Sequence, residues 1–241
     1  MWHKLQRSSV VILLLLCSAC ASTQTAEESY DRDPFEPVNR AIFAFNDGLD
    51  RVALGPLAKG YQAITPSFME RGIRNFFANL YDINGAFNAV LQGRFPEAAR
   101  DSGRFVVNTT IGMLGFVDVA SEMGIAPYRT DFGHTLSIWG FDSGPFLMLP
   151  ILGPRTVRSG TGLVVDSVVS VQWQLDRTTQ LTLFALELVD TRAALSRAED
   201  LISGDRYIFV RDAYLQQREY FVNDGIVDDA FSDSDEDFDW E

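Results

Sequence analysis

The two cysteines of this 241-residue chain, Cys17 and Cys20, lie in the segment LLLLCSACAS. A short basic head and the apolar run 10–16 precede them, and this run is far shorter than the roughly 18–20 residues that span a bilayer as a helix. The small pair Ser18–Ala19 comes directly before Cys20, whereas a bulky leucine comes before Cys17. This order is typical of a bacterial secretion signal that is cleaved in front of a lipid-modified cysteine.

We therefore predict that residues 1–19 are a lipoprotein signal peptide and that Cys20 is the site of lipid attachment. The alternative is an ordinary secretory signal with cleavage elsewhere. Residue 21 is Ala rather than Asp, which by the usual bacterial sorting rule favours the outer membrane. Residues 20–32 are small and polar, and we interpret them as a lipidated tether. A multi-chain lipid anchor holds a protein more firmly than one acyl chain.

His134 is the only histidine after the predicted signal peptide, and with Asp131 and Ser137 it suggests a hydrolase triad. Three residues in one short loop rarely reach triad geometry, and the sequence has no G-x-S-x-G elbow. A zinc site would need carboxylates almost alone, and a phosphate-binding G-x-x-x-x-G-K-[ST] loop is missing from the sequence. We therefore predict no catalytic residue, no metal and no cofactor.

Four polar residues are candidates for contact with a phosphate or a channel. Arg155 and Arg158 follow Gly153–Pro154 and could meet a phosphate at a helix N-terminus, or could form an ordinary solvated first turn. Asn39 and Arg40 could line a channel or only cap neighbouring backbone. The sequence leaves both pairs of alternatives open.

The composition indicates a folded, acidic chain. Apolar residues make up 46% of it, too many for a disordered protein, and the formal net charge is −13. No basic residue follows Arg218, while acids are dense from residue 224 onward, so we predict an acidic, disordered tail over 223–241. The lack of a basic stripe argues against nucleic acid as a partner.

Apolar residues at helical spacing predict an all-α domain over residues 33–222. The expected helices are one from Pro37 that Gly55–Pro56 ends, one opened by Thr65–Pro66, one stopped by Gly93, one from Pro96 to about 110, one around 181–195 and one around 207–221. The β-branched residues 163–173 are ambiguous between strand and helix.

The stretch 127–160 differs from the rest of the chain because it is rich in both glycine and proline, which break helices, and in large apolar residues. A loop of this length is uncommon and usually functional. Loops exposed to water are not this apolar. The stretch therefore either packs against the helices or faces lipid, and its chemistry leaves both open.

Five segments of the chain resemble the MlaA/VacJ family of outer-membrane lipoproteins, which maintain lipid asymmetry. They occur in the family's order over nearly the whole mature chain: DPFEPVNRAIFAFN (33–46), NFFANLYDINGAFNAVLQG (75–93), GRFVVNTTIGMLGFVDVA (103–120), DFGHTLSIWGFDSGPFLMLPILGP (131–154) and DRYIFVRDAYLQQR (205–218). Two positions depart from the family pattern, since Ser137 replaces a common Gly and Phe146 a common Tyr.

The resemblance implies a ring-like helical body in the inner leaflet of the outer membrane, on its periplasmic face. A central amphipathic channel would let phospholipid headgroups pass from the outer leaflet to the periplasm. Porin trimers and a soluble periplasmic lipid carrier would be the partners. Within this resemblance, the stretch 131–154 is the candidate gate beside the channel, with a turn at Gly144–Pro145 and with Trp139 and Phe146 touching lipid tails or neighbouring helices. A plain core-packing loop is the alternative.

The sequence therefore predicts a lipid-anchored phospholipid-transport protein of the outer membrane without catalysis. It would remove mislocalised phospholipid from the outer leaflet and pass it to the periplasmic carrier. Two other functions are the alternatives. One is a structural lipoprotein that braces porins, and the other is a periplasmic lipid hydrolase that uses Ser137 and His134.

Overall fold

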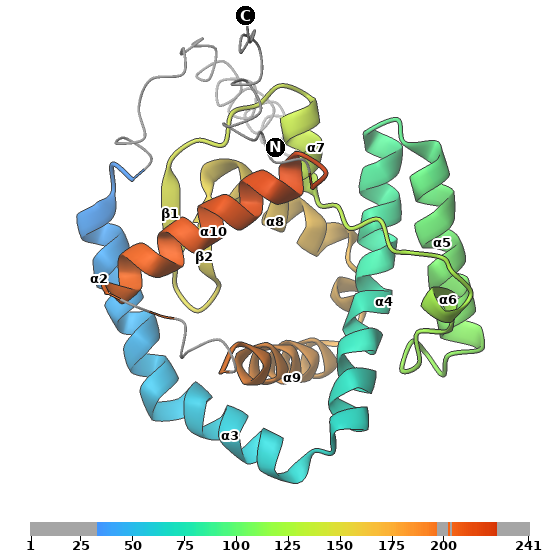
Figure 1. The fold of residues 1–241 in the computed structure, drawn as a ribbon, viewed down its shortest axis with the longest axis horizontal. Coiled ribbons are helices and arrows are strands. Elements are labelled where there is room, and N and C mark those ends of the chain that lie inside the picture. The colour runs from blue at the N-terminus through green and yellow to red at the C-terminus, as the bar shows by residue number, and fades with distance from the viewer. Residues whose placement is uncertain (1–32, 197–201, 203, 226–241) are drawn as a thin grey trace, which may run out of the picture.

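The computed structural model describes residues 33–196, 202 and 204–225 of the chain. These residues are mostly helical, and Figure 1 shows their helices arranged as a ring around an open centre. The all-α prediction is confirmed, with one addition, a two-stranded antiparallel hairpin. The signal peptide, Cys20 and the tether lie outside the described residues.

The first helix does not end where the sequence indicated. Helix α2 (Glu36–Leu49) continues through a π-helical turn (Asp50–Leu54) into α3 (Gly55–Ile64), so Gly55–Pro56 lies inside a continuous helical rod. Proline lacks an N–H and its ring collides with a carbonyl one turn earlier. The wider π turn directly before Pro56 lets the rod continue despite that collision.

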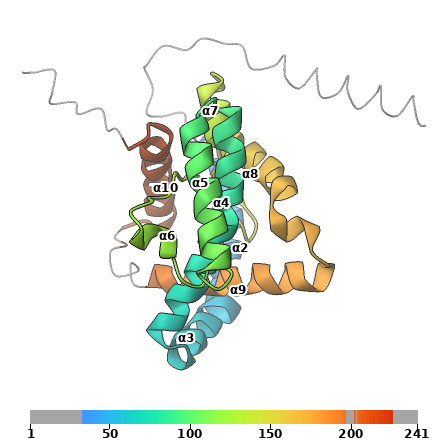
Figure 2. The same ribbon diagram turned by 90° about the vertical axis from the view of Figure 1, so that its right-hand side faces the viewer.

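The second and third expected helices are one helix, α4 (Ser67–Leu91). No proline or helix-ending glycine separates them, and the apolar residues continue at helical spacing through Leu80, Ile83 and Phe87. Helix α5 (Phe95–Thr110) matches the fourth expected helix and packs antiparallel along α4 (Figure 2). The short α6 (Val119–Glu122) follows, and its first turn is capped by Asp118.

The stretch 127–160 was expected to be irregular, and this is wrong for much of its length. It contains α7 (Phe132–Ile138), strands β1 (Phe146–Leu149) and β2 (Gly153–Thr156), and the start of α8 (Val157–Val169). The same α8 settles the ambiguous residues 163–169 as helix. Side chains of Asp131 and Thr156 cap the two helices by accepting backbone N–H bonds.

Two glycines let α7 and α8 pack closely against each other. A Cβ on Gly162 of α8 would lie 2.4 Å from the backbone nitrogen of Gly133 in α7, and a Cβ on Gly133 would lie 3.0 Å from the Cα of Ser159. The glycines therefore let the two helix backbones touch. Their function here is close packing, and the cost of glycine within a helix is offset by it.

The remaining helices close the ring. After a 3₁₀ turn (Val171–Gln174) come α9 (Arg177–Leu195) and α10 (Arg206–Val222), which begin at the capping carboxylates Asp176 and Asp205. Both agree with the sequence prediction. Figure 2 shows α9 crossing the lower end of α4, and Figure 1 shows α10 running across the opposite side of the ring. A small buried cluster of Phe146, Met148 and Tyr207 joins the hairpin to α10.

Candidate functional site: a charged central cavity

The ring encloses a cavity of about 680 Å³ whose wall comes from α4, α5, the segment 127–131, β2, α8, α9 and α10. Ten charged side chains line it, five arginines and five acids. The arginines are Arg74, Arg104, Arg129, Arg155 and Arg218, and the acids are Asp82, Asp131, Asp166, Glu187 and Asp190. Aromatic and aliphatic side chains fill the gaps between them, so the wall is amphipathic.

Three of the five arginines are bound to acids. Arg218 forms a bidentate pair with Asp131 at 2.5 and 2.7 Å. Burial raises the pKa of Asp131, but the two bonds from Arg218 outweigh it and hold that pKa below its usual range. Arg104 is buried between Asp82 and an acid outside the cavity, and Arg74 lies 3.7 Å from Asp190.

The other two arginines, Arg129 and Arg155, have no carboxylate partner among the residues that the structure describes. Arg155 is half-buried, and its Nη1 donates only to the neighbouring Pro154 carbonyl at 3.1 Å. Arg129 is exposed. An unneutralised guanidinium facing a cavity can bind a phosphate with two parallel hydrogen bonds.

Two acids of the wall receive only neutral donors. Asp166 accepts the backbone N–H of Phe132 at 2.9 Å and the amide of Asn88 at 2.8 Å, so that it ties α8 to α7 and α4. Glu187 accepts the hydroxyl of Tyr81. Burial raises the pKa of both carboxyls.

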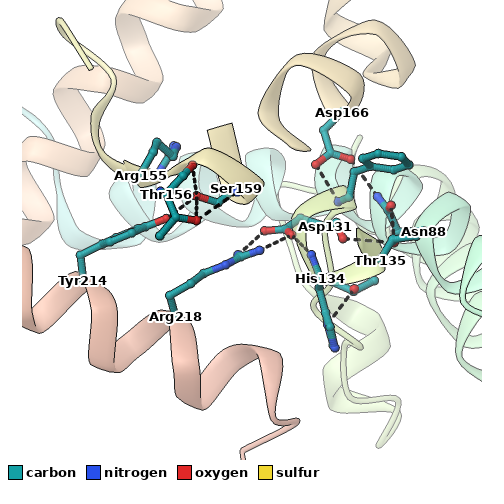
Figure 3. A network of polar contacts seen from close by, with 12 residues as sticks. Asn88, Asp131, His134, Thr135, Arg155, Thr156, Ser159, Asp166, Tyr214 and Arg218 are labelled. Carbon is teal, nitrogen blue, oxygen red and sulfur yellow. Dashed lines mark hydrogen bonds and ion pairs between the residues drawn. The ribbon is translucent and has the colours of Figure 1, made fainter. Parts of the chain in front are cut away.

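A polar network holds this part of the wall in place (Figure 3). Tyr214 of α10 shares a 2.7 Å hydrogen bond with Ser159, which also forms a capping box with Thr156 at the start of α8. The Asp131–Arg218 pair ties α10 to α7 in the same way. The network therefore positions α7, α8 and α10 around the cavity.

The geometry of His134 does not support a triad. The imidazole is buried, and its Nδ1 lies 3.1 Å from the Thr130 hydroxyl. The carboxylate of Asp131 accepts the backbone N–H of His134 and binds Arg218 instead of orienting the imidazole. No hydrogen bond joins His134 to Ser137 in the part of the chain that is described. Burial lowers the pKa of His134.

Asn39 binds the backbone of the β1–β2 hairpin and does not line the cavity. Its amide donates to the Phe146 carbonyl at 3.0 Å and accepts the Met148 N–H at 2.8 Å, along the free edge of β1. Asn46, two turns further along α2, holds the turn of the hairpin in the same manner. Of the two alternatives that the sequence left open, the structure therefore shows the backbone contact.

Arg40 and Arg158 also lie outside the cavity wall. Arg40 donates to Glu36 at 2.7 Å and to Asp205 at 2.8 Å, which joins α2 to the start of α10. Arg158 donates to the Phe141 carbonyl at 2.7 Å, and burial lowers its pKa. Of the four polar candidates from the sequence, Arg155 is the one that lines the cavity.

The candidate gate residues lie at different depths. Trp139 is half-exposed and donates to the Leu91 carbonyl at 3.3 Å. Gly144 has a left-handed φ of 65°, and the Pro145 carbonyl accepts the first N–H of α8. Phe146 is fully buried in the core cluster, so it packs against neighbouring helices.

The sequence reasoning missed most of the cavity wall, although a signal for it exists. Glu187, Asp190, Thr191 and Ala194 line the cavity at helical spacing on α9, and Tyr214, Arg218 and Phe221 do so on α10. These stripes combine polar, small and aromatic side chains, whereas the prediction of both helices relied on their apolar residues. Reading both faces of each helix would have found them.

The ring exposes many large apolar side chains. They occur along α2, the π turn and α3 and again along α8 and α9, and Val52 and Ile64 are 82% and 83% exposed. The exposed members on these helices include Val38, Phe45, Leu49, Leu57, Val164, Val168, Leu181 and Phe184. An apolar surface of this extent marks a contact with protein or membrane.

Asp224, in the predicted tail, is among the described residues and forms a 2.7 Å ion pair with Arg94. The disordered tail over 223–241 stays a prediction. Residues 226–241 lie outside the described part. Within that part, no helix is long and apolar enough to cross a membrane, and no group of acidic, histidine or cysteine side chains could hold a metal ion.

Comparison with known proteins gives a consistent result. The family model described as MlaA lipoprotein matches residues 31–221. The chain is 33% identical over 228 residues to the "Intermembrane phospholipid transport system lipoprotein MlaA" of Escherichia coli K12, covering 92% of this chain and 90% of that protein. It is 36% identical over 228 residues to the protein of the same name from Haemophilus influenzae, covering 89% and 91%.

A solved structure from a study called "Structural basis for maintenance of bacterial outer membrane lipid asymmetry" is also similar. It superimposes with a TM-score of 0.71 at 34% sequence identity, and the match covers 79% of this chain and 99% of that one. The ring of helices is thus shared with a protein of known structure.

Proposed function

The chain belongs to the MlaA lipoprotein family, and on this premise we propose that it removes mislocalised phospholipid from the outer leaflet of the outer membrane and passes it to the periplasm. Transport would keep the outer membrane asymmetric. It would be passive at this protein, with lipid moving through the central cavity. A soluble carrier would take the lipid onward.

One observation carries this proposal, namely a charged cavity within a ring that also exposes many large apolar side chains. Charged side chains line a cavity of about 680 Å³, while large apolar side chains are exposed along α2, α3, α8 and α9. A charged headgroup is costly to bring into hydrocarbon, and a polar wall lowers that cost. Exposed apolar side chains suit a body that lies among acyl chains.

The same proposal gives roles to individual residues and to a porin partner. Cys20 would carry the lipid anchor on the periplasmic side, and a porin trimer would hold the ring at the membrane. Arg155 would contact headgroups within the cavity. Trp139, Gly144, Pro145 and Phe146 would form the gate, in which Phe146 serves as the buried hinge and Trp139 as the half-exposed part.

The test is whether phospholipid accumulates at the cell surface without this protein. Intact cells of a deletion strain are labelled with a membrane-impermeant amine-reactive reagent, and labelled phosphatidylethanolamine is measured. We expect more label than in the parent strain, and restoration by a plasmid-borne wild-type copy. Equal labelling with and without the protein would contradict the proposal.

The same labelling assay distinguishes lipid transport from the two alternative functions, a structural porin brace and a lipid hydrolase. A porin brace would need the ring but not its cavity, so a cavity variant such as Arg155→Glu would restore normal labelling if bracing were the function. A hydrolase that used Ser137 would lose function in Ser137→Ala, whereas a channel would keep it. We expect Arg155→Glu to fail and Ser137→Ala to succeed.

A further inference from the structure

The charges of the cavity wall are not all balanced by one another. Arg74, Arg104 and Arg218 are each bound to acids. Arg155 and Glu187 are lining residues of opposite charge, and each lacks an ionic partner within the described chain. They therefore leave one positive and one negative group available to a ligand.

Both groups act on the same side chain, Tyr81 of α4. The Tyr81 hydroxyl donates a hydrogen bond to Glu187. Arg155 of β2 lines the same cavity as Tyr81 and Glu187. Its positive charge opposes the rise in the pKa of Tyr81 that desolvation and Glu187 cause. The cation, the hydroxyl and the acid are thus members of one cavity wall.

Regular secondary structure holds the backbone at both Arg155 and Glu187. Arg155 belongs to β2, where it is paired in register with Leu147 of β1, and the next residue begins the capping box of α8. Glu187 lies in the middle of α9, one turn before Asp190, which is held by Tyr61 and Arg74. A ligand would meet two preorganised groups, which lowers the entropic cost of binding.

The other wall acids are less suited to bind a cation. Asp166 uses both oxygens for protein donors that tie three helices together, and Asp131 is saturated by Arg218. Glu187 has only neutral donors and faces the cavity from a half-buried position. A primary ammonium could therefore bind it with a charge-assisted hydrogen bond.

We propose that Arg155, Tyr81 and Glu187 form a headgroup subsite for zwitterionic phospholipids that carry a primary amine. Arg155 binds the phosphodiester, Glu187 binds the ammonium, and Tyr81 holds the Glu187 carboxylate in place. This inference rests on the proposed function, and it names the lipid class that the cavity prefers. An anionic lipid without an amine would satisfy Arg155 but leave Glu187 unpaired.

The experiment measures lipid binding to the purified mature protein in detergent. Monomeric dihexanoyl phosphatidylethanolamine and dihexanoyl phosphatidylglycerol are titrated by isothermal calorimetry. We expect wild-type protein to bind the ethanolamine lipid about tenfold more tightly, as one charge-assisted hydrogen bond would provide. Arg155→Gln should weaken both lipids about tenfold, and Glu187→Gln should weaken only the ethanolamine lipid and remove the preference.

Matched control variants show whether a change in lipid affinity comes from loss of the subsite or only from the changed net charge of the protein. Arg71→Gln removes an exposed arginine outside the cavity, and Glu122→Gln removes an exposed acid outside it. Both should change either affinity by less than about twofold. Arg155→Lys, which keeps the charge but loses the planar fork, should fall between wild type and Arg155→Gln and also serves if Arg155→Gln does not fold.

Two results would overturn the subsite: equal wild-type affinities for the two lipids, or equal weakening of both by Glu187→Gln. The failure of this inference can be told from failure of the proposed function. If cells still need the protein to keep phospholipid off their surface while the purified protein shows no preference, transport stands and the subsite is wrong. If binding is as expected but surface labelling does not depend on the protein, the subsite stands and transport is wrong.

Discussion

Asp82 is a carboxyl held in a position that disfavours its charge. It is 7% exposed, and its Oδ2 lies 3.3 Å from Nε of the buried Arg104. Asp118 binds the same guanidinium at 3.1 Å. Burial raises the pKa of Asp82 to about 7, although the charge of Arg104 opposes the rise. Asp82 and Asp118 thus compete for the Arg104 guanidinium, and the more buried Asp82 is the one whose pKa is raised.

This competition predicts a pH-dependent stability. The folded-state pKa of Asp82, about 7, exceeds its unfolded value of 3.8, so its contribution is complete below 3.8 and is lost as pH rises through about 7. The cost of ionisation is at most about 4 kcal/mol, at about 1.4 kcal/mol per pKa unit. Between pH 5 and 8, the free energy of unfolding should fall less in Asp82→Asn than in wild type.

Urea unfolding of both proteins at several pH values measures this difference, with Glu122→Gln as an exposed control that should follow the wild type. Comparing variants is necessary because burial lowers the pKa of His134, which makes stability rise with pH below about 6.5 and so works in the opposite direction. Parallel curves for wild type and Asp82→Asn would refute the assignment.

At the scale of elements, α7 and α8 depend on the contact between their backbones. A Cβ on Gly162 would lie 2.4 Å from the backbone nitrogen and 2.9 Å from the Cα of Gly133, and neither atom can move as a flexible side chain could. Gly160 lies in the same helix, and a Cβ there would meet only the Cβ of Arg155, at 4.0 Å. The two positions form a matched pair.

We therefore expect Gly162→Ala to destabilise the protein by about 1–3 kcal/mol, because the added methyl overpacks the contact. Gly160→Ala should stabilise it by about 0.5–1 kcal/mol, since alanine favours the helix and meets no neighbour. Thermal unfolding followed by circular dichroism compares the two. A Gly162→Ala protein as stable as Gly160→Ala would show that α7 and α8 are not in backbone contact.

The same glycines show why sequence reasoning succeeded for some elements and failed for others. Helices α5, α9 and α10 are not interrupted by proline after their first turn, and the sequence predicted them. In 127–160, glycine indicated a helix breaker when considered alone, and its use in helix packing depends on a partner residue about 29 positions away. Local patterns do not contain that information.

The candidate site was harder to predict for a related reason. Arg155 was singled out because it follows Gly153–Pro154, and it does line the cavity. Asn39 looked equally suitable, yet its amide binds the edge of β1, which the sequence had not predicted as a strand. Whether a polar side chain faces a cavity or a neighbouring backbone depends on the ring closure, which no short window specifies.

At the scale of the whole molecule, the ring departs from the usual distribution of residues. Five arginines and five acids line the central cavity, and many large apolar side chains are exposed. Ordinary monomers bury such side chains and rarely expose contiguous apolar surface. The small core cluster of Phe146, Met148 and Tyr207 agrees with this, because much of the apolar surface is left for a partner or for lipid.

The exposed apolar side chains predict how the protein is anchored to the membrane. Two separate contributions are expected, the lipid on Cys20 and the exposed apolar side chains of the ring, and together they anchor better than either alone. Cys20→Ser should abolish acylation, as measured by mass spectrometry of the mature N-terminus, while Cys17→Ser should leave it intact.

The purified Cys20→Ser ring should still bind detergent micelles through α2, α3, α8 and α9, so it should aggregate when the detergent is removed. An unmodified Cys20 in wild-type protein would refute the anchor, and a monodisperse, detergent-free Cys20→Ser protein would refute the apolar contact with the membrane.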